Sequence, residues 1–145
     1  MQIAVLNGPN LNLLGQREPE IYGRASLADI EATVRGAAAA LDVEIDWFQT
    51  NHEGQMIEAV QRLRGQADGA LINAAALTHS SLALRDALLA VRVPFVELHL
   101  SNIFAREAER RHSVIADLAV GLVVGFGAQS YVLALQGLIG RLRAA

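Results

Sequence analysis

Short apolar runs alternate with helix-like segments along the whole chain, and this alternation limits the folds that the chain can adopt. The expected strands are residues 2–6, 43–49, 69–73, 94–98 and 118–124. The expected helices are residues 26–41, 53–64, 81–91 and 129–142. Strands that are apolar nearly throughout are typical of a parallel sheet covered on both faces. With right-handed crossovers, we predict an α/β three-layer sandwich that is flavodoxin-like, with a five-stranded parallel sheet of order 2-1-3-4-5.

Two local signals support the helix boundaries. Ser26 followed by Asp29 is typical of a capping box at the start of the first helix. Gly65 is expected to form the C-terminal cap of the helix over residues 53–64. With 145 residues and no low-complexity linker, the chain is expected to form a single domain over residues 1–145.

The composition excludes several kinds of chemistry. There is no Cys, so thiolate nucleophiles, disulfides and Cys-ligated metals are excluded. No spacing typical of metal ligands appears either, so no metal site is expected. There is also no Lys, since all 12 cationic side chains are Arg, so an imine-forming lysine is impossible. A net charge of −3 and a sequence pI of about 5.8 argue against nucleic-acid binding. No apolar run is long enough to span a membrane, and we expect a cytoplasmic protein.

Polar loops follow strands 1, 3 and 4, where an open parallel sheet binds its ligands. They are residues 7–23, 73–81 and 99–113. Together they hold Asn10, Arg17, Tyr22, Asn73, His79, His99, Arg106, Arg110, Arg111 and His112. Each of these residues alone has an ordinary structural interpretation, such as a turn-forming Asn, but their convergence favours a functional site. Tyr131, in the apolar last helix, is interpreted as a packing residue.

Four segments carry a resemblance to a known family. They are NGPNLNLLGQREPEIYG, NHEGQMIEAVQ, LTHSSLALRDAL and ELHLSNIFARE followed by RRHS. The chain resembles type II 3-dehydroquinate dehydratase (type II dehydroquinase) over essentially its full length. The resemblance implies a hydro-lyase of the shikimate pathway or of quinate catabolism. It would convert 3-dehydroquinate to 3-dehydroshikimate and water by anti elimination through an enolate, with no cofactor. It also implies a homo-oligomer, a dodecamer built as a tetramer of trimers.

The same resemblance assigns roles to residues. It implies that Tyr22 is the catalytic base, Arg17 its activating arginine and His99 the general acid. Asn10 would orient a water near the enolate, and Glu97 would position the histidine. The implied substrate contacts are Asn73, His79, Asp86, Leu100, Ser101 and Arg110, with Leu100 and Ser101 acting through backbone amides. Many members of the family have Gly in the turn after strand 3, where this chain has Ala75.

These residue types suit the implied chemistry. The proton beside a ketone is weakly acidic, so a strong base is needed, and free tyrosine is only about 0.1% ionised at pH 7. A neighbouring guanidinium stays charged and favours the tyrosinate. A histidine is a suitable acid for expelling hydroxide as water near neutral pH.

Two other interpretations remain open from the sequence. The chain could be a flavodoxin-like binding module, either for FMN or of the receiver type. A receiver would need an acidic cluster after strand 1 and a Lys, and an FMN site would need Ser or Thr in the first loop, where none precedes Ser26. A catalytically inactive homologue is the other interpretation, against which the presence of Tyr22, Arg17 and His99 argues.

Overall fold

The computed structural model describes residues 1–16 and 18–145. The strands are β1 (Gln2–Asn7), β2 (Glu44–Gln49), β3 (Gly69–Asn73), β4 (Phe95–His99) and β5 (Gly121–Val124). The α-helices are α1 (Pro19–Tyr22), α2 (Leu27–Ala40), α3 (Glu53–Arg62), α4 (Leu82–Val91) and α5 (Gln129–Ala144). Short 3₁₀ helices are η1 (Leu11–Leu13), η2 (Ala75–His79), η3 (Ile103–Ala105), η4 (Ala108–Arg110) and η5 (Ala116–Leu118).

The five strands form one parallel sheet in the order β2-β1-β3-β4-β5, which confirms the predicted topology. The register pairs Asn7 of β1 with Gln49 of β2 on one side and with Asn73 of β3 on the other. His99 ends β4 opposite Val124. The carboxyl edge of the sheet therefore gathers polar side chains from three neighbouring strands, β2, β1 and β3, beside the histidine of β4.

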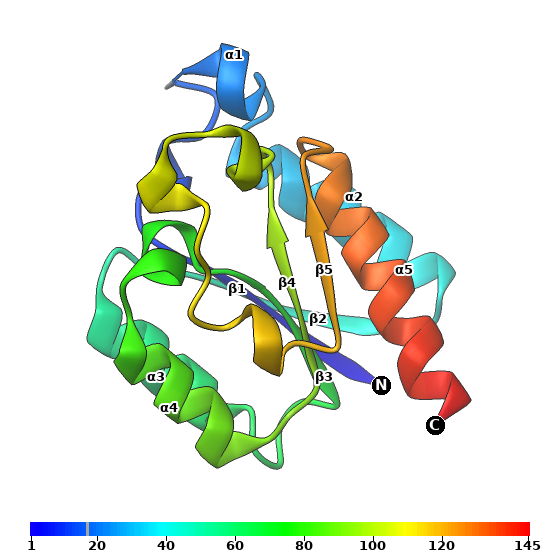
Figure 1. Ribbon diagram of the computed structural model, residues 1–145. Coiled ribbons are helices and arrows are strands. Elements are labelled where there is room, and N and C mark those ends of the chain that lie inside the picture. Colours follow the sequence, from blue (N-terminus) through cyan, green and yellow to red (C-terminus); the bar gives the residue numbers. More distant parts are fainter. Residues whose placement is uncertain (17) are drawn as a thin grey trace.

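Helices cover both faces of the sheet, as Figure 1 shows: α2 and α5 on one face, and α3 and α4 on the other. Successive strand residues point to opposite faces. In β1, Ile3 and Val5 pack into the core beneath α2 and α5, whereas Ala4 and Leu6 pack beneath α3 and α4. All four are buried, which explains why the strand is apolar at every position between its polar end residues Gln2 and Asn7.

The helix starts agree with their sequence signals. The Ser26 hydroxyl accepts from the Asp29 amide, and the Asp29 carboxylate accepts from the Ser26 amide, which confirms the capping box. The predicted end of the second helix is wrong, because α3 ends at Arg62 with Leu63 at its cap. Gly65 lies beyond the cap at φ +78°, in the turn that leads toward β3.

The predicted start of the fifth strand is also wrong. Residues 116–118 form η5, where the Leu118 amide donates to the Ile115 carbonyl, and β5 begins only at Gly121. The short helix α1 was not expected from the sequence; it lies inside the polar loop after β1, next to the carboxyl edge of the sheet (Figure 1). Within the described residues, no helix combines the length and the apolar character that crossing a membrane requires.

Candidate active site

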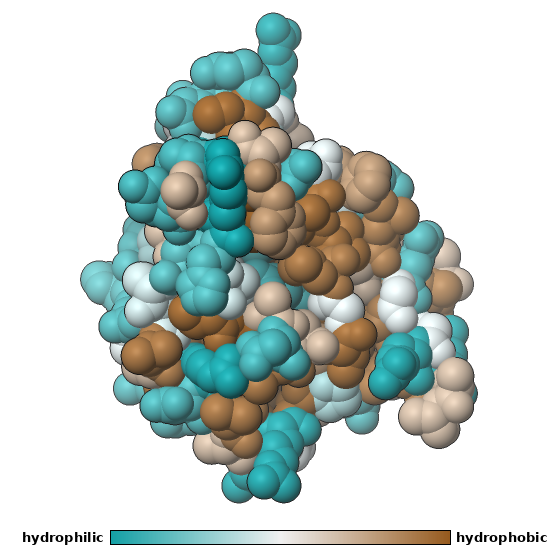
Figure 2. All heavy atoms as spheres, in the orientation of Figure 1, coloured by the Kyte–Doolittle hydropathy of each residue, from teal (hydrophilic) through white to brown (hydrophobic). Residues whose placement is uncertain are grey.

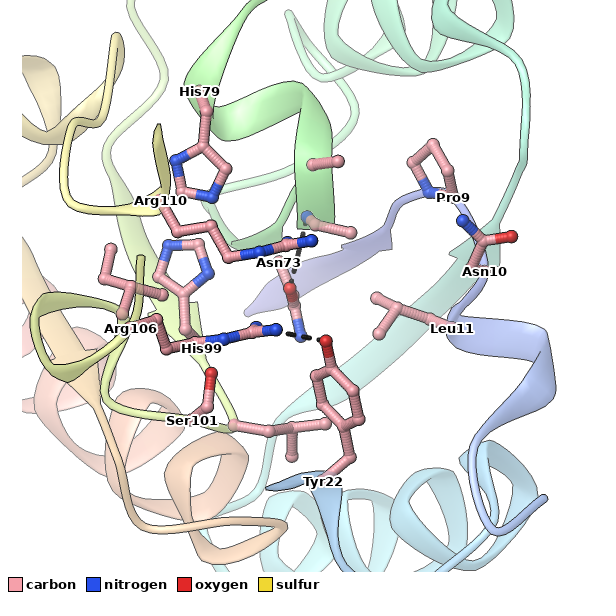
Figure 3. Close-up of a pocket in the computed structure, with 14 residues that line it drawn as sticks. Pro9, Asn10, Leu11, Tyr22, Asn73, His79, His99, Ser101, Arg106 and Arg110 are labelled. Carbon is pink, nitrogen blue, oxygen red and sulfur yellow. Dashed lines mark hydrogen bonds between the residues drawn. The ribbon is translucent and has the colours of Figure 1, made fainter. Parts of the chain in front are cut away.

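A cleft of about 580 Å³, including its open mouth, lies at the carboxyl edge of the sheet (Figure 3). Its walls come from the segments that follow β1, β3 and β4 together with α1. The lining residues are Pro9, Asn10, Leu11, Tyr22, Asn73, Ala75, Ala76, His79, His99, Leu100, Ser101, Ile103, Arg106 and Arg110. The amide, imidazole, phenol and guanidinium groups among them suit a small polar molecule.

A close backbone approach at Gly8 brings the first loop against the third. The Gly8 amide donates to the Asn73 carbonyl at 2.8 Å. A Cβ at this position would lie 2.4 Å from the Ala74 carbonyl oxygen, so only glycine fits here without backbone movement. Asn10 follows with left-handed backbone at φ 68°. Its backbone N–H donates to the side-chain oxygen of Asn51. The turn thus brings Asn10 to one wall of the cleft.

Glu97, His99 and Ser113 form a hydrogen-bonded row at the end of β4. His99 Nε2 lies 2.7 Å from Glu97 Oε1, and both side chains are buried. The Ser113 hydroxyl lies 2.8 and 3.0 Å from the two carboxyl oxygens of Glu97. Its oxygen also accepts from the amides of Ile115 and Ala116, so its single proton is directed at the carboxylate. Glu97 is thereby an acceptor for His99 Nε2–H, and the other ring nitrogen of His99 is the one available to a ligand.

His79 lies beside His99 in the cleft. The two rings stack with centroids 6.3 Å apart and an interplanar angle of 19°. His79 Nδ1 lies 2.7 Å from the carbonyl oxygen of His112, which fixes the ring orientation. The second ring nitrogen of His79 can therefore serve as a polar contact for a ligand.

Tyr22 points from α1 into the cleft, opposite the histidines (Figure 3). Arg106 Nη1 donates to the Tyr22 hydroxyl at 3.0 Å. The guanidinium also lies over the phenol ring, 5.4 Å from its centroid. One guanidinium is therefore in contact with both the hydroxyl and the ring of Tyr22 inside the cleft.

Arg110 supplies a second cation to the same cleft. Its Nε lies 2.5 Å from Glu107 Oε1, and the hydrogen bond from Arg110 lowers the pKa of Glu107 below its ordinary value. The same pairing raises the pKa of Arg110, so the guanidinium stays charged. Its side chain remains one-third exposed and can meet a ligand carboxylate, for which the planar guanidinium is well suited.

The structure brings most of the sequence-predicted residues together. The predicted residues that line the cleft are Asn10, Tyr22, Asn73, His79, His99, Leu100, Ser101 and Arg110. Glu97 lies directly behind His99. Asp86 is an exception among the described residues: it is exposed on α4 and lies outside the cleft lining of its own chain. Arg17 lies outside the described residues.

Sequence reasoning missed three residues that contact members of the predicted site. Arg106 is one of several arginines in the loop after β4, and the sequence does not indicate its contact with Tyr22. Ser113 ends the RRHS motif, and the sequence does not indicate its contact with Glu97. The interpretation of Tyr131 as a packing residue is incomplete, because its buried hydroxyl bonds to Asn7 and Asn73. A Tyr in a buried helix face is a usable signal, since a buried hydroxyl requires partners.

Comparison with known proteins is consistent with this geometry. The family model described as dehydroquinase class II matches residues 1–139. A 3-dehydroquinate dehydratase from Synechococcus sp. (strain WH7803) is 56% identical over 143 residues, covering 99% of this chain and 97% of the relative. The crystal structure of a type II dehydroquinase from Propionibacterium acnes superposes with a TM-score of 0.91 at 39% identity, covering 96% of each chain. The corresponding structure from Butyrivibrio crossotus gives 0.93 at 38% identity, covering 96% of this chain and 97% of that one. The chain therefore belongs to the class II dehydroquinase family.

Proposed function

We propose that this protein is a 3-dehydroquinate dehydratase, a hydro-lyase that acts in the shikimate pathway. The observation that carries the proposal is the pairing of two opposed proton-transfer groups in one cleft. Tyr22 is held by a cation and His99 by a carboxylate. These are the partners that a base and an acid of these types need. A binding module for FMN or of the receiver type is not favoured, because the family and its relatives are dehydratases.

In the proposed reaction, the Tyr22 oxygen removes the proton from the carbon beside the ketone. The electron pair of that C–H bond forms the carbon–carbon double bond of an enolate, whose negative charge rests on the former ketone oxygen. Arg106 stabilises the tyrosinate before the transfer, and Arg17 is proposed to act with it. Asn10 is proposed to orient a water against the enolate oxygen. The step needs neither a metal nor a cofactor.

In the second step, His99 donates a proton to the hydroxyl on the neighbouring carbon. The enolate electrons return to form the ketone and the new double bond, the C–O bond breaks, and the hydroxyl leaves as water. Glu97 accepts the hydrogen bond from Nε2–H of His99, which leaves the opposite ring nitrogen to deliver the proton. Exchange with solvent then returns a proton to His99 and removes one from Tyr22.

The remaining lining residues are proposed to hold the substrate. Arg110 suits the substrate carboxylate, and Asn73 and His79 suit its hydroxyl groups. Leu100 and Ser101 are proposed to contribute their backbone amides. Asp86 is also proposed as a substrate contact; because it lies outside its own chain's cleft, it would reach a site only from a neighbouring copy.

The molecule is proposed to work as a homo-oligomer in the cytoplasm, with twelve subunits as a tetramer of trimers. Figure 2 shows apolar side chains gathered over β5 and the adjoining part of α5. Val120, Leu122 and Phe126 are 38%, 40% and 63% exposed there. In the described part of the chain β5 is an edge strand with β4 as its neighbour, and a second copy would cover such an apolar edge. Light scattering coupled to size exclusion would detect the assembly, and a stable monomer at micromolar concentration would refute it.

The activity is tested by following the absorbance of the enone product formed from 3-dehydroquinate. The wild-type protein is expected to form it, whereas Tyr22→Phe should fold normally and lose nearly all turnover while still binding substrate. Borohydride added with substrate should leave the mass of the chain unchanged, because an enolate mechanism forms no reducible imine. A variant lacking the Tyr22 hydroxyl that keeps more than a few per cent of the rate would exclude Tyr22 as the base.

A further inference from the structure

A buried polar chain links helix α5 to the cleft. Tyr131 is fully buried, and its hydroxyl donates to Asn7 Oδ1 at 2.7 Å. The same oxygen accepts from Asn73 Nδ2 at 2.9 Å. Asn7 and Asn73 are register partners on β1 and β3. Of these three residues, Asn73 is the one that lines the cleft.

The donor and the acceptor of each hydrogen bond among Asn7, Tyr131 and Asn73 follow from the bond at the Phe48 end. The Phe48 carbonyl can only accept, so Asn7 Nδ2, 3.0 Å away, must donate to it. Asn7 then presents its oxygen to Tyr131, whose hydroxyl must donate. Burial raises the pKa of Tyr131, which keeps that proton in place. The phenol oxygen is left as an acceptor, so Asn73 must turn its nitrogen toward it.

The hydrogen bond at the Asn73 end agrees with these donor and acceptor roles. Asn73 Oδ1 accepts from the Ala75 amide at 3.3 Å (Figure 3). If the Asn73 amide were reversed, its NH₂ would face the Ala75 N–H and its oxygen would face the oxygen of Tyr131. Two hydrogen bonds would be lost in a buried setting, where unpaired polar groups are costly. One orientation of Asn73 is therefore strongly preferred.

We infer that Tyr131 is a positioning residue whose hydroxyl sets the orientation in which the Asn73 amide meets the substrate. The inference rests on the proposed function, in which Asn73 contacts the substrate. In this orientation the second N–H of Asn73 and the remaining lone pair of its oxygen are available to the substrate in a defined arrangement. Without the Tyr131 hydroxyl, only the longer bond from the Ala75 amide orients the Asn73 side chain, so its orientation is less well fixed and binding weakens.

The test compares Tyr131→Phe, Asn73→Ala and the double variant in steady-state kinetics. Tyr131→Phe is expected to raise KM about 3- to 10-fold, the worth of one hydrogen bond, with kcat changed less than about threefold. Because Tyr131 acts through Asn73, adding Tyr131→Phe to Asn73→Ala should leave KM unchanged. A merely structural role would instead lower stability by a similar amount in both backgrounds and leave KM unmoved in both.

Two further variants guard against a folding defect. Trp47 packs on the Tyr131 ring with centroids 5.8 Å apart, so Trp47→Phe is the control: it should lower Tm without raising KM. Asn7→Ala removes the acceptor of the Tyr131 proton, frees the hydroxyl to turn toward Asn73, and is expected to raise KM as Tyr131→Phe does. The inference would be overturned if KM stayed at the wild-type value in both Tyr131→Phe and Asn7→Ala. It would also be overturned if the effects of Tyr131→Phe and Asn73→Ala on KM were additive in the double variant. If the wild-type protein itself fails to dehydrate 3-dehydroquinate, the proposed function fails instead.

Discussion

Replacing Arg106 by Gln tests how the cleft prepares its base. Arg106 Nη1 donates to the Tyr22 hydroxyl at 3.0 Å, and its guanidinium covers the phenol ring. The glutamine side chain is shorter and uncharged, so Arg106→Gln removes the cation from both positions. Tyr22 keeps its ring and hydroxyl, and the fold should be unaffected because Arg106 lies in the irregular segment after β4.

The size of the effect follows from the contact. A hydrogen bond to a charged group is worth about 1.5–3 kcal/mol. At about 1.36 kcal/mol for each factor of ten, kcat should fall about 10- to 150-fold. The Arg106 side chain is only 16% exposed, so water compensates little for its loss. The loss should stay smaller than in Tyr22→Phe, because Arg17 is proposed as a second activating cation.

The assay is kcat for 3-dehydroquinate measured from pH 6 to pH 9. Arg106→Lys keeps a positive charge, so its kcat should fall between those of the wild type and Arg106→Gln. Arg35→Gln removes a surface arginine that pairs with Glu31 on α2, and it should leave kcat unchanged. A rate for Arg106→Gln within twofold of wild type across this range would refute the argument.

Three further predictions concern neighbouring contacts. Ser113→Ala removes the hydroxyl that bonds to Glu97 and should lower kcat about tenfold, whereas Ser113→Thr should retain most of the rate. Ala75 has left-handed backbone at φ 52°, so Ala75→Gly should relieve about 1 kcal/mol of strain. The greater entropy of glycine in the unfolded chain offsets part of this gain, so Tm should rise only slightly in thermal unfolding. Hydrogen bonds from Ser26 lower the pKa of Asp29, so its carboxylate stabilises the fold above the unfolded-state pKa and this contribution is lost as pH falls. The Tm deficit of Asp29→Ala should therefore be present at pH 7 and shrink below about pH 4.

The sequence was sufficient to predict the sheet and the location of the cleft, because both depend on simple periodicities. Strand residues alternate between faces, so apolar runs without alternation indicate a sheet covered on both sides. The same alternation puts Glu97 and His99 on one face of β4, which explains their contact. The boundaries were less predictable: residues 118–120 are apolar enough for a strand, but the turn of η5 delays pairing with β4 until Gly121.

The irregular segment between β4 and β5 limited the prediction of the site. It contains Arg106, Arg110 and Arg111 within six positions, and no periodicity distinguishes them. Their roles depend on the turns of η3 and η4. Arg106 lies over Tyr22, and Arg110 pairs with Glu107 at the cleft, whereas Arg111 donates to the carbonyl of Arg106 and supports the turn. Three identical side chains thus make different contacts because the backbone places each of them differently.

Tyr131 marks a different limit, because its partners come from elements remote in sequence. It is 58 residues from Asn73 and 124 from Asn7, and it reaches both only because α5 packs against the sheet near the ends of β1 and β3. The α5 residues that follow it, 132–135, are apolar, so hydropathy alone assigns it to the core, where its ring does lie. Its hydroxyl gives the better clue: a phenol buried at the carboxyl edge of a parallel sheet needs polar partners, and one of the polar groups available there, Asn73, lines the cleft.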